Sequence, residues 1–265
     1  MWVTPVSILA TPLVTQLRAA GRTLLAAAAL LSVASAPARA QLGAGDGFLF
    51  RTPTVRLGLT AGLSAPRARS DVFDFITEEL TLGRGDFSAP AFSLSASFRV
   101  APRVDVGLST DFAGRTADSE TRNFVGEDNL PVLQSTTLSR ATVMATARLS
   151  LAAEGRAIGR YAWIPNRVVP FVGAGAGPVW YRLRQSGEFV DAQTLDIFED
   201  EFESSGWSLG AAGFGGADIS VTPRYGITVE GRYLWAKGAM NGDFSTYNKI
   251  DLSGYNASIG LFVRF

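Results

Sequence analysis

The chain has 265 residues, of which 47% are hydrophobic and 18% charged, and its 24 basic and 24 acidic side chains balance. This composition is typical of a folded protein and excludes a disordered chain, while the balanced charge argues against a nucleic-acid partner. The sequence contains no cysteine and no histidine, which excludes disulfides, thiolate and histidine metal ligands, and the commonest general base of enzymes.

The first 40 residues have the three parts of a secretory signal peptide. The arginine-bearing stretch 18–22 precedes the uncharged run 23–36, and 38–40 supplies a small-residue A-x-A cleavage site. The alternative is a membrane-anchor helix, but the run is shorter than the roughly 20 apolar residues that such a helix needs. We therefore expect cleavage after Ala40, with a short periplasmic segment, 41–52, before the folded domain, 53–265.

Eight later segments alternate between apolar and other residues over roughly ten positions, as transmembrane β-strands do. Pro178 interrupts the fifth segment. Because proline cannot donate a hydrogen bond to a neighbouring strand, we expect a bulge there or an early end of that strand. The eight segments are 53–64, 91–100, 104–112, 141–151, 170–181, 207–221, 225–235 and 255–265.

The connections between these segments alternate in length. Tight Pro-Arg turns occupy 101–103 and 222–224, whereas the links after the first, third, fifth and seventh segments are each longer than about ten residues. Short turns at one end and long loops at the other predict an antiparallel up-and-down barrel with both termini in the periplasm. The connection 152–167 is the exception, because it falls on the short-turn side and is long.

The apolar strand faces could point inward, as in a soluble ligand-carrying barrel, or outward into lipid. Three features favour lipid: the apolar faces carry no charge, the opposite faces are polar or small, and aromatic residues gather at strand ends as they do at membrane interfaces. The fold class predicted is all-β, an eight-stranded antiparallel up-and-down transmembrane β-barrel. Its interface aromatics are Phe98, Phe112, Trp180, Trp207, Tyr225, Trp235, Tyr255 and Phe265.

Four stretches carry a family resemblance: GAGAG at 173–177, the glycine-rich run 206–224 that ends in TPR, VEGRY at 229–233 and the terminal FVRF. They resemble small outer-membrane β-barrel proteins of the OmpA, OmpX and OmpW type from Gram-negative bacteria. The resemblance implies a location in the cell outer membrane and contact with its lipid and lipopolysaccharide. It also implies that Phe265 is an assembly signal for the barrel-assembly machinery.

Charged residues recur on the face expected to line the lumen. The interior of an eight-stranded barrel is just wide enough for side chains, and buried charges there must be paired or solvated. The charges could form a salt-bridged plug that closes the barrel or a gate over a narrow pore, and both readings stay open. They are Arg56, Arg99, Asp105, Arg148, Asp218, Glu230, Arg232 and Arg264.

An acidic stretch falls in the expected loop between the fifth and sixth strands. Clustered carboxylates can bind a divalent cation of the kind that bridges lipopolysaccharide, but we favour a solvated surface loop whose charges lie apart. Phenylalanines between the acids could instead contact an extracellular partner. The spacing does not match an EF-hand. The acids are Glu188, Asp191, Asp196, Glu199, Asp200, Glu201 and Glu203.

These observations predict a protein that is not an enzyme and needs no cofactor. Small barrel enzymes of the outer membrane resemble one another in using a histidine, which this sequence lacks. We expect a structural or interaction role through long extracellular loops. The alternatives are a narrow passive channel, or an OmpW-like conduit for small molecules, and a secreted soluble ligand-binding barrel.

Overall fold

The computed structural model describes residues 48–126, 130–159, 162–191 and 194–265. The predicted signal peptide and most of the expected segment 41–52 lie outside the described residues. Within the described ranges, no helix has the length and apolar character needed to cross a membrane.

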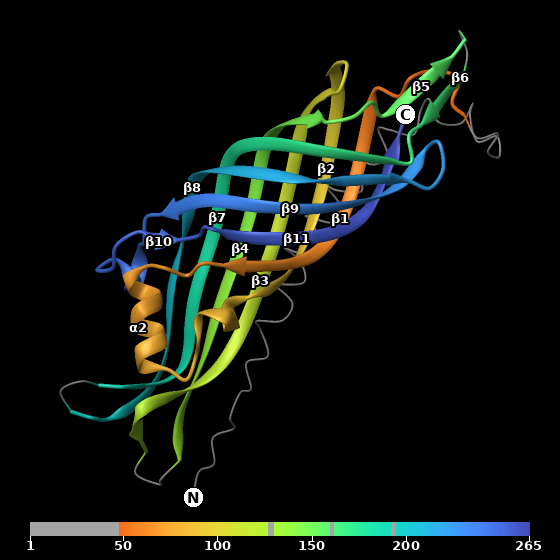
Figure 1. Cartoon of the computed structure of the whole chain (residues 1–265). Helices are drawn as coiled ribbons and strands as arrows, with labels where there is room; N and C mark the ends of the chain where they lie inside the picture. The colour runs from red at the N-terminus through yellow and green to blue at the C-terminus, as the bar shows by residue number, and fades with distance from the viewer. Residues whose placement is uncertain (1–47, 127–129, 160–161, 192–193) are drawn as a thin grey trace, which may run out of the picture. The chain divides into compact units, whose positions relative to one another are not determined.

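Eight long strands close into a ring, so the predicted eight-stranded antiparallel barrel is confirmed (Figure 1). Each strand pairs with the next along the chain, and β11 pairs with β1 over Arg56↔Arg264 to Pro66↔Gly254. The two-residue β10, Ile250–Asp251, pairs with the end of β9 at Lys237 and Gly238 and is not one of the ring strands. The ring strands are β1 Val55–Pro66, β2 Ala89–Ala101, β3 Val104–Val125, β4 Pro131–Ser150, β7 Val168–Val190, β8 Ile197–Ser220, β9 Tyr225–Gly238 and β11 Gly254–Arg264.

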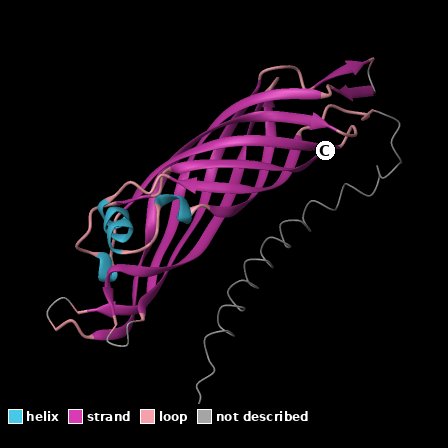
Figure 2. Ribbon diagram, turned by 60° about the horizontal axis from the view of Figure 1, so that its bottom comes forward, coloured by secondary structure: helices cyan, strands magenta, loops and turns pink. Residues whose placement is uncertain are grey.

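The two ends of the barrel differ (Figure 2). The turn end holds the tight β2–β3 and β8–β9 turns and the C-terminal Phe265. It also holds the long connection 152–167, which is long because it forms a hairpin of β5, Gly155–Ile158, and β6, Ala162–Pro165. The helix end holds α2, Asp71–Glu79, and two short 3₁₀ helices, η2, Arg84–Phe87, and η3, Gly242–Phe244.

Four strands run further toward the helix end than the sequence pattern predicts. β3 continues to Val125 and β7 to Val190, so the connections 126–130 and 191–196 are short. The expectation of four long loops is therefore wrong for these two. The extensions are rich in polar residues, and cross-strand hydrogen bonds such as Thr116–Thr137 (2.8 Å) help to hold them. Their few apolar side chains, such as Leu138 and Leu183, join the buried apolar cluster at the helix end.

Pro178 neither bulges β7 nor ends it, so that expectation is also wrong. Val179 pairs with Thr142 and Ala176 with Ala145, at one unchanged register. Toward β8 the ladder continues through Pro178. Toward β4 the pairs at Gly177 and Pro178 are missing, because proline has no N–H to donate.

Inward-facing glycines make room for three aromatic rings inside the barrel. Each ring lies beside its own register partner, a glycine on the next strand. A Cβ added at Gly173 would lie 2.3 Å from the Phe214 ring, and one at Gly226 would lie 2.3 Å from the Phe262 ring. Aromatic side chains that cover strand glycines restore packing that glycine alone cannot supply. The three pairs are Gly173–Phe214, Gly216–Phe171 and Gly226–Phe262.

This packing predicts that Gly173→Ala will be destabilising. The new methyl group must displace the Phe214 ring, and we expect the free energy of unfolding to fall by about 1–3 kcal/mol. Urea titration of the detergent-folded protein, followed by tryptophan fluorescence, measures the change. Gly231→Ala is the matched control, because an added Cβ there meets only the Gly215 carbonyl oxygen, at 4.0 Å. Equal unfolding midpoints for the two variants would contradict the prediction.

Candidate functional site

The outward face of the ring is apolar across its middle. Leu59 adjoins both Leu94 and Leu261 in the register, and the three side chains are 56%, 44% and 66% exposed. In the ring strands, which are described in full, no charged residue falls on this face between the two aromatic levels. All the predicted interface aromatics except the half-buried Trp180 are exposed: Phe98, Phe112, Trp207, Tyr225, Trp235, Tyr255 and Phe265.

Inside the ring, Asp218 of β8 joins two arginines at the turn end. Its carboxylate accepts a hydrogen bond from Arg56 Nη2 at 2.6 Å and pairs with Arg148 from β4. Arg99 Nε donates to Asp105 at 3.1 Å, and its Nη2 pairs with Glu154. We call these groups, together with Arg264, the turn-end cluster: Arg56, Arg99, Asp105, Arg148, Glu154, Asp218 and Arg264.

The inward aromatic rings support this cluster from below. The Arg56 guanidinium lies 3.7 Å from the centre of the Phe262 ring, and that of Arg148 lies 3.7 Å from the centre of the Phe171 ring. Cation–π contacts of this kind gain strength where water is excluded. The glycines make room for the rings, and the rings support the two guanidinium groups. Arg56 and Arg148 are thereby held where both can pair with Asp218.

Further along the lumen, two arginines bind groups on the far side of the barrel. Arg232 of β9 donates to Asp111 of β3 at 2.8 Å, and it also pairs with Glu230 at 2.9 Å. Arg140 of β4 donates to the Leu252 carbonyl oxygen at 2.6 Å and to Ser64 Oγ of β1 at 2.8 Å. In a ring of eight, β3 is the fourth neighbour of β9, so the Arg232–Asp111 pair spans the full diameter.

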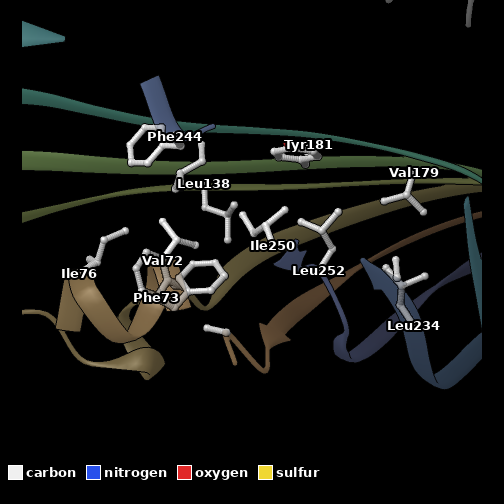
Figure 3. Close-up of a cluster of buried hydrophobic side chains, with 14 of the residues drawn as sticks. Val72, Phe73, Ile76, Leu138, Val179, Tyr181, Leu234, Phe244, Ile250 and Leu252 are labelled. Carbon is white, nitrogen blue, oxygen red and sulfur yellow. The ribbon is translucent and has the colours of Figure 1, made fainter. Parts of the chain in front are cut away.

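At the helix end an apolar core replaces the charges (Figure 3). The helix α2 turns Val72, Phe73 and Ile76 inward, and each is fully buried. They belong to one buried cluster with ring residues such as Tyr181 and with Leu252, which precedes β11. Asp71 begins the helix, and hydrogen bonds from the backbone and side-chain amides of Asn248 hold its carboxyl pKa below the ordinary value.

Most of the acidic stretch lies on strands, so its prediction as a loop is wrong. Glu188 belongs to β7 and Glu199, Asp200, Glu201 and Glu203 to β8, with only Asp191 and Asp196 in the connection. The reason is local pairing: arginines of β7 form ion pairs with acids that lie diagonally across the ladder on β8, namely Arg184–Glu201 and Arg182–Glu203 (2.6 Å). The described residues hold no group of three or more acidic side chains placed to bind a metal ion.

The structure places all eight predicted lumen charges on the inward face and adds three groups that the sequence reading missed. Asp111 and Arg140 share the strand parity of Asp105 and Arg148, so the same alternation could have identified them. Glu154 lies in the turn-end connection, where no periodicity indicates which way a side chain points.

Because the Asp218 carboxylate pairs with two largely buried arginines, we expect Asp218→Asn to lower the free energy of unfolding by about 3–5 kcal/mol. The control is Glu201→Gln, which breaks an ion pair whose side chains are 33% and 46% exposed and should cost about 1 kcal/mol or less. Urea unfolding of both variants in detergent measures the difference. A cost for Asp218→Asn no larger than that of the control would contradict the proposed pairing.

The Asn248–Asp71 contact predicts a pH dependence at the helix end. Since the folded-state pKa of Asp71 is lowered, its stabilisation is complete above the ordinary value of about 3.9 and is lost as the pH falls through the lower folded value. The backbone amide resonance of Asn248, followed by NMR during acidification, should titrate with a midpoint below about 3.9. Asp71→Asn should abolish the titration. A midpoint at or above the ordinary value would show that the contact is absent.

No protein-family model and no curated protein sequence matches this chain. Among solved structures it is similar to Neisserial surface protein A, with 15% identity over 81% of this chain and 98% of that chain and a TM-score of 0.41. It is also similar to the outer membrane protein OprG from Pseudomonas aeruginosa, with 14% identity, 81% and 97% coverage and a TM-score of 0.47. Both are small outer-membrane β-barrel proteins, the kind that the sequence motifs resemble. At identities this low the similarity does not extend to function.

Proposed function

We propose that this chain is an integral β-barrel of the Gram-negative outer membrane that is closed to solutes and acts through its helix end. The support for membrane insertion is the exposed apolar band, with large side chains such as Leu209 (82% exposed) and Leu261 (66%). A continuous apolar surface around a closed ring is unstable in water and stable in hydrocarbon, where the ring also pairs its backbone groups. A soluble ligand carrier would place that surface inside.

The main support for a closed lumen is the set of hydrogen bonds and ion pairs that cross it. Arg232 reaches Asp111 on the opposite strand, and Arg56 and Arg148 converge on Asp218. The apolar core under α2 fills the helix end. Side chains that bond across the full width support a lumen without a continuous water path, and so a barrel that acts as a scaffold for the groups at its helix end.

The proposed orientation places the helix end outside the cell and both termini in the periplasm. Two of the three connections between ring strands at the turn end are tight turns, while the long β1–β2 and β9–β11 connections and the strand extensions project from the helix end. This asymmetry is usual for outer-membrane barrels. In this orientation the helix end faces lipopolysaccharide and any extracellular partner. In the folded barrel the Phe265 carbonyl accepts hydrogen bonds from the backbone N–H groups of Thr54 and Val55. Before folding, Phe265 would be recognised by the barrel-assembly machinery.

A narrow passive channel, or an OmpW-like conduit, is the second candidate. The observation in its favour is a polar cavity of about 60 Å³ between the turn-end cluster and Arg232, lined by hydroxyls that include Ser93, Ser95 and Thr146. Such a cavity has room for a few ordered waters. Rearrangement of the Asp218 pairs would connect it to the turn end.

Conductance in planar bilayers separates the two candidates. We expect no conductance steps from the wild-type protein, and none when residues 71–79 are replaced by a Gly-Ser linker, because the turn-end cluster still closes the lumen. Heat-dependent mobility on gels must first show a folded, detergent-resistant barrel for both proteins. Steps from the wild-type protein would establish the channel and refute the closed barrel. Extraction of the protein by salt alone would refute membrane insertion.

A further inference from the structure

Ring closure places two arginines directly opposite each other. Arg56 of β1 and Arg264 of β11 are register partners, and both side chains face the lumen. Like charges at directly opposed positions of an antiparallel pair destabilise it, and the penalty grows where water is excluded. Arg56 is compensated by Asp218, but no carboxylate among the described residues lies within ion-pair distance of Arg264.

Arg264 is nevertheless deeply buried. The residue is 5% exposed, and its polar contact is with the neutral Ser220 Oγ, at 2.6 Å. Its guanidinium lies 4.8 Å from the centre of the Phe262 ring and 5.5 Å from that of Trp163, on the turn-end hairpin. Its Nε is buried and has no hydrogen-bond partner among the described residues. Neither hydroxyl nor ring supplies a full negative charge.

The turn-end cluster as a whole therefore carries an excess of one positive charge. It contains four arginines but only three carboxylates, and each carboxylate is already bound to at least one arginine other than Arg264. An uncompensated buried cation costs several kcal/mol, so the cluster favours uptake of one anion.

A cavity of suitable size adjoins the unpaired group. It measures about 10 Å³, and its lining includes the three arginines Arg56, Arg99 and Arg264. Asp105 and Glu154 also line it, and both are paired with Arg99. A space of this volume has room for one small particle, which favours a monatomic anion over larger oxyanions and organic carboxylates.

We propose that this cavity is a binding site for a single monatomic anion, chloride or bromide, held between the guanidinium groups of Arg264 and Arg56. The anion balances the cluster and turns the unfavourable Arg56–Arg264 juxtaposition into a bridged pair. The site is built from the charges of the turn end alone.

Urea unfolding of the protein in non-ionic detergent, with sodium chloride replacing sodium gluconate at constant ionic strength, tests this site. An anion that binds only the folded state lowers the unfolding constant in proportion to its concentration above the Kd. In wild-type protein we expect a tenfold rise in chloride to lower the unfolding constant about tenfold. Arg264→Gln should remove this dependence and, in gluconate, be more stable than wild type. Arg167→Gln, an exposed arginine at the same end, should behave as wild type.

Two outcomes would overturn the site: no chloride dependence in the wild-type protein, or the same dependence in Arg264→Gln. Should Arg264→Gln fail to fold, an anion series on the wild-type protein decides. Bromide must replace chloride and sulfate must not. Equal effects of sulfate and chloride at equal ionic strength would show surface screening in place of a site.

Discussion

Closure of the sheet between β1 and β11 is the constraint on which the rest of the structure depends. In hydrocarbon an unpaired backbone N–H or C=O costs several kcal/mol, so a spanning sheet must leave no edge. Eleven register pairs, from Arg56↔Arg264 to Pro66↔Gly254, join the last strand to the first. A slip by one residue would turn Leu59 into the lumen and Arg56 into lipid, so the lipid itself enforces the register.

A closed ring of eight strands also limits what its lumen can contain. Side chains must fill the space, and any charge among them needs a partner within it. The glycines opposite Phe171, Phe214 and Phe262 admit three rings, and arginines lie over those rings. At the helix end the lumen instead receives the apolar face of α2. One barrel therefore has two interiors, one held by charge and one by the hydrophobic effect.

The strands and their outward faces could be predicted because lipid imposes a strict two-residue period on them. The inward direction of Asp105, Arg148 and Asp218 follows from the same period, as does that of the overlooked Asp111 and Arg140.

The pairing partners could not be predicted in the same way. Arg232 meets Asp111 only because the ring brings β9 opposite β3, which no local pattern encodes. The helix α2 is short, and the strand extensions mix many polar residues with a few buried apolar ones, so their periodicity is weak. The stretch 188–203, predicted as a loop, is mostly strand because arginines of β7 form ion pairs with acids of β8 across the hairpin.

In the proposed closed barrel, ion pairs close the turn end and apolar packing closes the helix end. Because these interactions differ, one end can open without the other. The ion pairs of the turn-end cluster are strong because the ring and the surrounding lipid create a low dielectric. Closure at this end therefore depends on insertion of the barrel into the membrane. The core under α2 is held by the hydrophobic effect, which favours burial of Val72, Phe73 and Ile76. This core lies at the helix end, beyond the apolar band of the strands. Loosening α2 therefore leaves the Asp218 pairs intact, and loss of those pairs leaves α2 in place. In the proposed closed barrel, a continuous path would therefore need both events at once.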